Sequence, residues 1–292
     1  LMIDNHQYKF ILSGSSARTL KRGSANLLGG RALRYELYPF VSQEIPNFDL
    51  IRALNHGLIP DHYINDDPQD LIHAYVGSYL KEEVIAEALT RNIQAFSRFL
   101  EAAAFSNGEI INYTAIASEC GVKSVTVKEY FQILEDTLIG KTIPSYQARP
   151  KRRVIKAPKF YYFDLGIVNY LLKRIKITEG NEVFGKAFEH FIFQELVANS
   201  HYSRKHYPIS YWRTTSHIEV DFILGSHEVA IEVKGKKRLI PKDFKGLFEF
   251  QREYKAKKLI LICLEKDPRV HKGIEVLPWK LFLDRLWNGE II

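Results

Sequence analysis

Two short runs in the C-terminal third of the chain place charged side chains between apolar ones. Glu219 and Asp221 alternate with apolar residues in the first run, and Glu232 and Lys234 do so in the second, with a turn at 225–227 between them. A period of two predicts adjacent strands and puts each pair on one face of its strand. If the two faces coincide, carboxylates and an ammonium group meet at one point of the sheet.

Such a meeting point suits the metal-dependent hydrolysis of a phosphodiester. Carboxylate oxygens hold Mg²⁺, which binds the phosphate oxygens of a substrate directly. A lysine beside them can stabilise charge on the phosphate or assist the attacking water. The alternative is a half-buried sheet with a solvated charged face. Because apolar residues flank the charged ones on both sides, we favour the first interpretation.

The spacing of these residues resembles the signature of the PD-(D/E)xK nuclease superfamily. Asp221 is followed after ten residues by Glu232, and Lys234 completes the Glu-x-Lys triplet. The resemblance implies that Asp221 and Glu232 hold Mg²⁺, with the carbonyl of Val233 as a candidate further ligand. It also implies that Lys234 orients the attacking water.

A helix expected over 183–198 would supply one more carboxylate. Phe184, Phe188 and Phe191 recur at helical spacing and give this helix a wide apolar face. In the superfamily an upstream helix contributes a glutamate, and the resemblance places that group at Glu189. Glu195 is the second choice.

The elements expected in this region follow the order αβββαβ, which is the core of that superfamily. They are the helix 183–198, strands near 207–213, 217–224 and 228–234, a helix 241–256, a strand 258–264, and a final strand and helix within 274–288. The order predicts a restriction-endonuclease-like α/β domain over 166–292.

Length and composition indicate a globular protein with an anionic partner. The chain has 292 residues, 46% of them hydrophobic and 26% charged, with a net charge of +7 and a pI near 9.1. No apolar run approaches the ~20 residues of a membrane span. The two cysteines lack metal-ligand spacing, and isolated thiols fit a reducing cytoplasm. We therefore predict a cytoplasmic protein without a membrane partner.

The N-terminal segment carries a second resemblance. A short strand at 8–12 runs into Ser13-Gly-Ser15-Ser, followed by a helix at 17–21, a Gly-Gly-Arg31 turn and another strand at 33–38. Read from the residues alone, this is a strand–helix–strand fragment. The sequence motifs of this segment resemble those of prokaryotic AAA-superfamily ATP-binding proteins that carry a C-terminal nuclease-like domain. The resemblance implies that Ser13, Ser15 and Arg31 are remnants of a nucleotide-sensing region.

The phosphate-binding parts of such an ATPase are absent from this sequence. There is no G-x-x-x-x-G-K-[ST] motif and no apolar strand ending in acidic residues ahead of the segment at 8–12. We therefore expect that this chain alone neither binds nor hydrolyses ATP. The only methionine stands behind Leu1, which indicates a start partway into a longer protein or a non-ATG start codon; both interpretations remain open.

The segment 92–165 predicts a DNA-binding module. Helices are expected over 93–104 and 112–120, the second closed by Gly121, and a third is capped by Ser124 and runs to Leu138. The block resembles the winged helix-turn-helix of the same ATPase family; the alternative is a structural three-helix bundle. The expected DNA-facing residues of the third helix are Lys123, Ser124, Thr126 and Lys128.

A basic stretch follows that helix. Residues 141–159 hold seven Lys or Arg and no Asp or Glu, which suits a wing lying on a phosphate backbone. The expected phosphate contacts are Lys151, Arg152, Arg153 and Lys156. Behind the stretch, Asp164 is expected to cap a short helix rather than to take part in catalysis.

Together these expectations describe a multidomain α/β protein. The predicted parts are an ATPase-core remnant at 1–40, a helical lid or connector at 41–91, the winged-helix module at 92–165 and the nuclease-like domain at 166–292. The predicted function is DNA binding with Mg²⁺-dependent phosphodiester hydrolysis. The alternative is a non-catalytic DNA-binding or interaction remnant. A second copy of the chain or a separately encoded ATPase half are the further expected partners.

Overall fold

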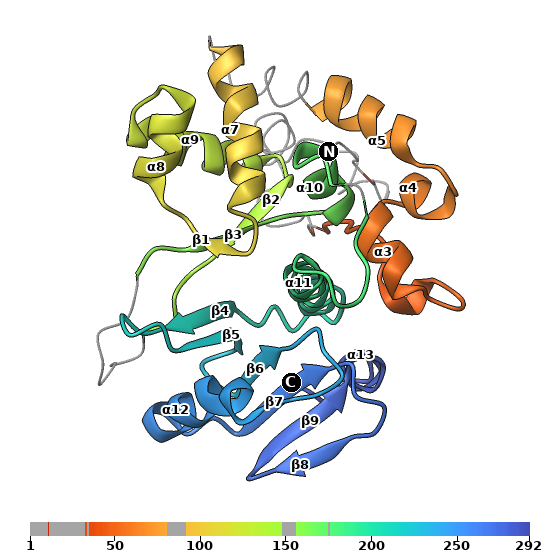
Figure 1. The fold of residues 1–292 in the computed structure, drawn as a ribbon, viewed down its shortest axis with the longest axis vertical. Helices are drawn as coiled ribbons and strands as arrows, with labels where there is room; N and C mark the ends of the chain where they lie inside the picture. The colour runs from red at the N-terminus through yellow and green to blue at the C-terminus, as the bar shows by residue number, and fades with distance from the viewer. Residues whose placement is uncertain (1–10, 12–32, 34, 81–91, 148–155, 175) are drawn as a thin grey trace, which may run out of the picture.

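The computed structural model describes residues 11, 33, 35–80, 92–147, 156–174 and 176–292. These residues form a mixed α/β structure with a three-stranded sheet of order β1-β3-β2 and a six-stranded sheet of order β4-β5-β6-β7-β9-β8 (Figure 1). Ser13, Ser15 and Arg31, and the strand and helix predicted around them, lie outside the described residues. None of the described helices is long and apolar enough to cross a lipid bilayer.

The segment from 41 to 80 is an interrupted run of short helices, as the sequence predicts. Asp49 caps the first α-helix by accepting a hydrogen bond from the Arg52 N–H, and Gly57 ends it at a positive φ of 81°. Residues 33 and 35–38, where a strand was expected, have no strand pairing. The elements are η1 Ser42–Glu44, α3 Leu50–His56, α4 Pro60–Ile64, α5 Gln69–Ala74 and η2 Tyr75–Leu80.

Three helices and a small sheet follow. Asn92 and Asn112 cap the first two helices, and Gly121 closes the second in the left-handed conformation. The prediction that Ser124 caps the third helix is wrong: Lys123 is the N-cap, no side chain makes a capping bond, and Ser124 is the first helical residue. The elements are α7 Ile93–Phe105, β1 Glu109–Ile110, α8 Tyr113–Cys120, α9 Ser124–Asp136, β2 Gly140–Ile143 and β3 Lys159–Tyr162.

A short helix, α10 (Leu165–Leu171), connects this part to the rest of the chain. The Asp164 carboxylate caps it by accepting from Gly166 N and also accepts from Leu58 N at 2.6 Å, which confirms the predicted capping role. Burial raises the pKa of Asp164 to about 6, although these backbone hydrogen bonds oppose the rise. The carboxylate thus joins α10 to the end of α3.

The C-terminal part has the predicted order of helix, three strands, helix and strand. β4 to β6 are antiparallel, β7 and β9 continue the sheet in parallel, and the edge strand β8 was not expected. The elements are α11 Phe184–Tyr202, β4 Ile209–Arg213, β5 Glu219–Leu224, β6 Val229–Val233, η3 Pro241–Phe244, α12 Lys245–Tyr254, β7 Lys258–Cys263, β8 Arg269–His271, β9 Ile274–Pro278 and α13 Trp279–Trp287.

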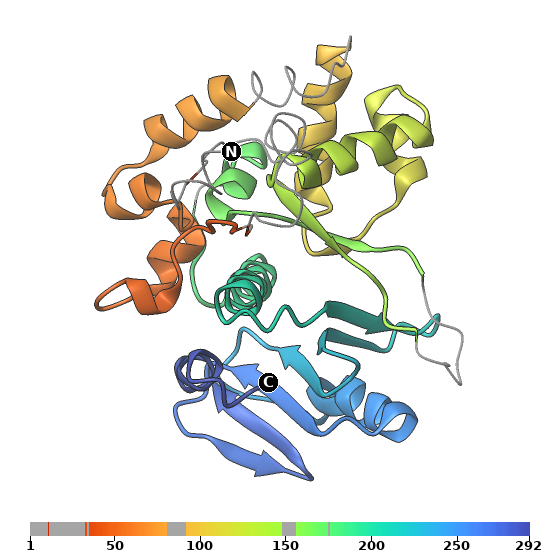
Figure 2. The ribbon, with the colours of Figure 1, turned by 180° about the vertical axis from the view of Figure 1, so that it is seen from behind.

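Helix α11 lies between the six-stranded sheet and the N-terminal helices (Figure 1). It packs against α3 and α10 on one side and against β6 and α13 on the other. The same layering is seen from behind, with the large sheet at one end of the molecule (Figure 2). Phe188 and Phe191 of α11 share one apolar core with Leu54 of α3 and Ile231 of β6. The N-terminal and C-terminal parts therefore share buried surface through this helix.

Helix α12 covers the opposite face of the six-stranded sheet. Leu247 and Phe250 pack there with Trp212 and Leu261 in a separate apolar core. Gly246 lies so close to β5 that a Cβ at this position would collide with the carbonyl oxygen of Glu219. This glycine lets the helix approach the strand that carries the predicted site.

Candidate functional site

The strands β5 and β6 bring Asp221, Glu232 and Lys234 to one end of their ladder. Phe222 pairs with Ile231 across the two strands, and Asp221 stands one residue before Phe222. Its Oδ2 accepts a hydrogen bond of 2.8 Å from the backbone N–H of Val233. The Asp221 carboxylate therefore lies directly beside the Glu-x-Lys backbone, as the predicted site requires.

A bulge in β5 falls at Asp221 and Phe222. The register with β4 shifts between Ser210 and Trp212, so that two residues of β5, Asp221 and Phe222, stand where β4 has one. Phe222 packs in the core beneath α11, whereas its neighbours Val220 and Ile223 both pack beneath α12. The simple alternation assumed from the sequence therefore breaks at Asp221.

The buried Glu232 carboxylate and the half-buried Lys234 ammonium form an ion pair, which confirms that they share a face. Lys234 Nζ lies 2.5 Å from Glu232 Oε1, while Glu232 Oε2 is buried without a hydrogen-bond partner. Burial and the nearby charge of Asp221 raise the pKa of Glu232 to about 8 against the lowering effect of Lys234. Burial lowers the pKa of Lys234, but Glu232 and Asp221 more than offset this and hold it above its ordinary value.

Glu189 projects from α11 towards the same region, but two groups of β3 already bind it. The Tyr161 hydroxyl donates to its Oε1 at 2.6 Å, and Lys159 Nζ lies 3.3 Å from the same oxygen. Burial raises the pKa of Glu189 to about 7, with Lys159 lowering it and Asp221 raising it further. The helix carboxylate of the sequence prediction is therefore part of a contact between β3 and α11.

Lys159 is the centre of that contact, and the sequence did not single it out. Its side chain is 3% exposed, and its Nζ also lies 2.5 Å from Glu219 Oε1 of β5. Arg213 holds the second oxygen of Glu219 at 3.2 Å. Burial alone would lower the pKa of Lys159, but Glu189 first, then Tyr161, Glu219 and Asp221, hold it well above its ordinary value.

Not all of the basic residues in the stretch 141–159 face solvent. Lys159 is one of the seven basic residues of this stretch, and it is buried against two carboxylates. Lys141, at the other end of that stretch, is half-buried, and this burial lowers its pKa. Lys156 is exposed as expected, whereas Lys151, Arg152 and Arg153 lie outside the described residues.

The donors at the end of β5 and β6 suit a hard cation in type, although the set is small. Asp221 and Glu232 offer carboxylate oxygens, and Glu232 Oε2 is a buried oxygen without a hydrogen-bond partner, which a cation could satisfy. Among the described residues, no three His, Cys, Asp or Glu side chains are grouped to hold a metal ion. A Mg²⁺ ion here would thus depend on two carboxylates, the carbonyl of Val233 and water.

Glu195, the second choice for the helix carboxylate, has a different role. It is 1% exposed and accepts hydrogen bonds of 2.7 Å from Ser42 N and from Trp287 Nε1. Burial raises its pKa to about 7 against these bonds. Glu195 therefore ties η1 and α13 to α11.

His190, beside Glu189, reinforces the contact between α11 and β3. Its Nε2 lies 2.7 Å from the Tyr162 carbonyl and its Nδ1 3.0 Å from Asn107 Nδ2. A neutral ring satisfies both, with Nε2–H donating and Nδ1 accepting. Burial lowers the pKa of His190 to about 3.

We expect this histidine to make the folded state sensitive to acid. Between its ordinary pKa of 6.5 and about 3, the unfolded chain takes up a proton that the folded chain does not, so stability falls as pH falls through this window. Urea unfolding at several pH values measures the free energy of unfolding against pH. In this window its slope should be shallower for His190→Gln than for the wild type. Equal slopes would show that other groups dominate.

The residues expected to face DNA lie at the start of α9. Lys123 and Lys128 are exposed, and Ser124 and Thr126 are half-buried. Lys128 Nζ lies 5.3 Å from the ring centroid of Tyr113 on α8, which restrains its side chain. The exposed lysines thus lie at the N-cap and in the N-terminal half of α9.

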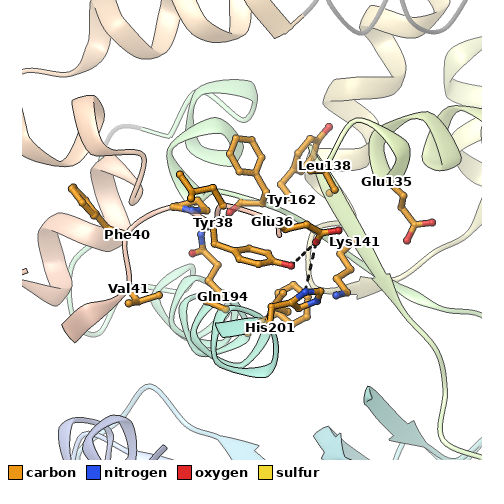
Figure 3. Close-up of a pocket in the computed structure, with 17 residues that line it drawn as sticks. Glu36, Tyr38, Phe40, Val41, Glu135, Leu138, Lys141, Tyr162, Gln194 and His201 are labelled. Atoms are coloured by element: carbon orange, nitrogen blue, oxygen red, sulfur yellow. Dashed lines mark hydrogen bonds and ion pairs between the residues drawn. The ribbon is translucent and has the colours of Figure 1, made fainter. Parts of the chain in front are cut away.

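A separate pocket lies where the segment before η1 crosses between β2 and α11 (Figure 3). It has a volume of 270 Å³ and combines apolar walls with the charged side chains of Glu36, Glu135 and Lys141. Tyr38 donates to Glu36 Oε2 at 2.7 Å, and His201 Nδ1 lies 3.9 Å from the same oxygen. None of these residues was identified from the sequence, because they come from four distant segments.

Comparison with known proteins finds two domain families side by side. Residues 47–177 match a domain of unknown function, DUF8612, and residues 184–282 match a second domain of unknown function, DUF4143. No solved structure matches the chain.

Three uncharacterized bacterial proteins are similar over most of the chain. Those of Mycobacterium tuberculosis and Mycobacterium bovis are each 23% identical over 234 residues, which cover 77% of this chain and 52% of the relative. One of Haemophilus influenzae is 22% identical over 232 residues, covering 73% and 55%. The chain spans about half the length of these relatives. It is thus similar to two adjoining domain families, whose boundary falls in the segment just before α11.

Proposed function

We propose that the protein binds DNA and hydrolyses a phosphodiester bond with Mg²⁺ at the end of β5 and β6. The observation that carries this proposal is the group formed by the buried Asp221 and Glu232 and the half-buried Lys234. Asp221 accepts a hydrogen bond from the backbone between the other two. This is the arrangement that the PD-(D/E)xK resemblance implies. The order α11, β4, β5, β6, α12, β7 supports it as well.

The side chains of this group have distinct roles in the proposal. Asp221 and Glu232 supply oxygens to the cation, with Glu232 Oε2 lacking another partner. Bound Mg²⁺ would supply positive charge to the scissile phosphate and acidify a water. Lys234, whose ammonium is stabilised by Glu232 and Asp221, donates to a phosphate oxygen or to the attacking water and does not act as a base.

DNA binding is assigned to α8 and α9 as a winged helix-turn-helix, with the chain between β2 and β3 as the wing. Lys123 and Lys128 supply exposed charge where a recognition helix enters the major groove. The match of 184–282 to a domain found in AAA-ATPase-associated proteins supports the AAA-related origin. Without a phosphate-binding loop in this sequence, ATP binding would need a separate ATPase chain or segment.

The direct test is incubation of the purified chain with supercoiled plasmid. We expect nicked circles to accumulate with Mg²⁺ and not with EDTA. The absence of nicking over a range of Mg²⁺ and Mn²⁺ concentrations would reject hydrolysis while leaving DNA binding intact.

Two observations favour a second function, a non-catalytic DNA-binding module. Lys159 already supplies positive charge to Glu189 and Glu219, and no three acidic, cysteine or histidine side chains of the described residues are grouped for a metal. In that case the cluster of Lys159, Glu189 and Glu219 joins the two halves of the protein. Only the exposed basic residues, such as Lys123 and Lys128, contact DNA.

Both functions predict the same effect of removing charge from α9. Replacing Lys123 and Lys128 by glutamine should weaken duplex binding and reduce the slope of log Kd against log salt by about 1 for each phosphate that the variant no longer neutralises. Titrations at several salt concentrations measure this. Lys257→Gln, an exposed lysine before β7, is the control. An unchanged slope in the double variant would remove α9 from the DNA interface.

A further inference from the structure

A basic cavity lies between α3, α5 and α10, away from the residues assigned above. Its volume is 620 Å³, and its wall includes Arg174, Lys173, Lys176, His56, Asn169 and Tyr170. Lys173 and Lys176 are exposed at its rim, and Arg174 is half-buried. Cavities of roughly 300–1,000 Å³ are the size of small-molecule sites.

Arg174 is an incompletely compensated charge in this wall. Its guanidinium makes one long hydrogen bond of 3.4 Å, to Asn169 Oδ1, and no ion pair joins it to a described carboxylate. Burial lowers the pKa of Arg174, and no acidic neighbour raises it. A guanidinium has five N–H donors suited to a carboxylate or phosphate, so most of the donors of Arg174 are available to a ligand.

Arg52, which α3 contributes to the same cavity, differs from Arg174 because it has an acidic partner. Arg52 pairs with Asp66 at 2.9 Å and donates to the carbonyls of Tyr63, Ile64 and Asn65. Its role is to hold α4 onto α3. Within the described part of the chain, Arg174 is thus the half-buried cation of the cavity that lacks an acidic partner.

Two further features of the wall point to an anion. His56 lines the cavity, and its Nδ1 is buried without a hydrogen-bond partner. The acidic side chain of the lining, Asp49, is already used as the cap of α3, where it accepts from Arg52 N at 3.1 Å. The cavity therefore presents a surplus of positive charge and an unused ring nitrogen.

We propose that this cavity binds a phosphate group and has room beside it for one nucleotide. Arg174 binds the phosphate with paired N–H donors, Lys173 and Lys176 add charge at the rim, and the neutral ring of His56 donates from Nδ1 in the tautomer that carries its proton there. Tyr170 and Ile72 supply the aromatic and apolar wall for the rest of the ligand. The phosphate can come from a free nucleotide or from a DNA backbone, because both present the same oxygens.

Calorimetric titration of the full chain with AMP, inorganic phosphate and adenosine tests the proposal. We expect AMP and phosphate to bind and adenosine to bind at least tenfold more weakly than AMP. Arg174→Gln should weaken AMP binding at least tenfold. Arg252→Gln, which removes an exposed arginine on α12, should leave it unchanged.

The remaining arms separate the sources of phosphate and guard against misfolding. If a 12-base-pair duplex binds the wild type but not Arg174→Gln, while neither AMP nor phosphate binds the wild type, the site is supported and its phosphate comes from DNA. If Arg174→Gln does not fold, the exposed pair Lys173→Gln and Lys176→Gln should still weaken AMP binding severalfold. Equal affinity for AMP and adenosine, or wild-type affinity in the folded Arg174 variant, would overturn the proposal.

Discussion

Replacing Asp221 by asparagine is expected to lower Mg²⁺-dependent plasmid nicking at least ~10²-fold without unfolding the protein. The amide oxygen of asparagine can still accept the hydrogen bond from Val233 N that Asp221 Oδ2 accepts at 2.8 Å. The substitution therefore removes the negative charge and keeps the contact between β5 and β6. Initial rates of conversion from supercoiled to nicked plasmid measure the decrease.

Lys234→Met should produce a decrease of similar size for a different reason. It removes the ammonium group that Glu232 Oε1 holds at 2.5 Å, so the charge on the phosphate is no longer offset from this side. Because the change also leaves Glu232 without its partner, the urea midpoint of the variant must be measured with its activity. A loss of nicking at unchanged urea midpoint assigns Lys234 to the reaction.

Matched controls separate the site from the surface charge of the protein. Lys257→Met and Asp284→Asn remove one exposed charge each, before β7 and on α13, and should nick like the wild type. If Asp221→Asn nicks as fast as Asp284→Asn, the hydrolytic proposal is rejected and DNA binding alone remains.

The local features of the site could be predicted from the sequence because they depend on near neighbours. Alternating apolar residues set the strands β5 and β6, and the phenylalanine spacing set α11. Gly121 ends α8 and Asp164 caps the start of α10, each through hydrogen bonds to residues only two to four positions away. The order of polar and apolar residues therefore predicts where these helices and strands form and end.

The features that the sequence did not reveal depend on distant contacts. The bulge at Asp221 follows from the pairing of β5 with β4, and a period-two pattern does not report a register shift. Lys159 reads as part of a basic run, yet its partners are Glu189 and Glu219, 30 and 60 residues further along the chain. The number of charged residues in a stretch of sequence does not tell which of their side chains are buried.

Lys159→Met is expected to destabilise the protein by about 3–5 kcal/mol, the usual cost of breaking a buried ion pair from one side. The lysine is 3% exposed, and its removal leaves the Glu189 carboxylate, whose pKa burial already raises, without its ion-pair partner, whereas Glu219 keeps Arg213 at 3.2 Å. Urea unfolding at pH 8, where both carboxylates of the unfolded chain are ionised, should show the full effect. Lys156→Met, an exposed lysine three residues earlier, should stay within about 0.5 kcal/mol of the wild type.

A second substitution shows whether this change in the free energy of unfolding belongs to the cluster. In Lys159→Met with Glu189→Gln, the carboxylate that lost its ion-pair partner is neutralised, so part of the stability should return and the two changes should be non-additive. Additive effects would mean that Lys159 acts through packing against the Tyr211 ring, whose centroid lies 5.5 Å from its Nζ. The same variant bears on both proposed functions. If Mg²⁺ raises the urea midpoint of Lys159→Met but not that of the wild type, the carboxylates can hold a cation, and the lysine contributed by β3 competes with it.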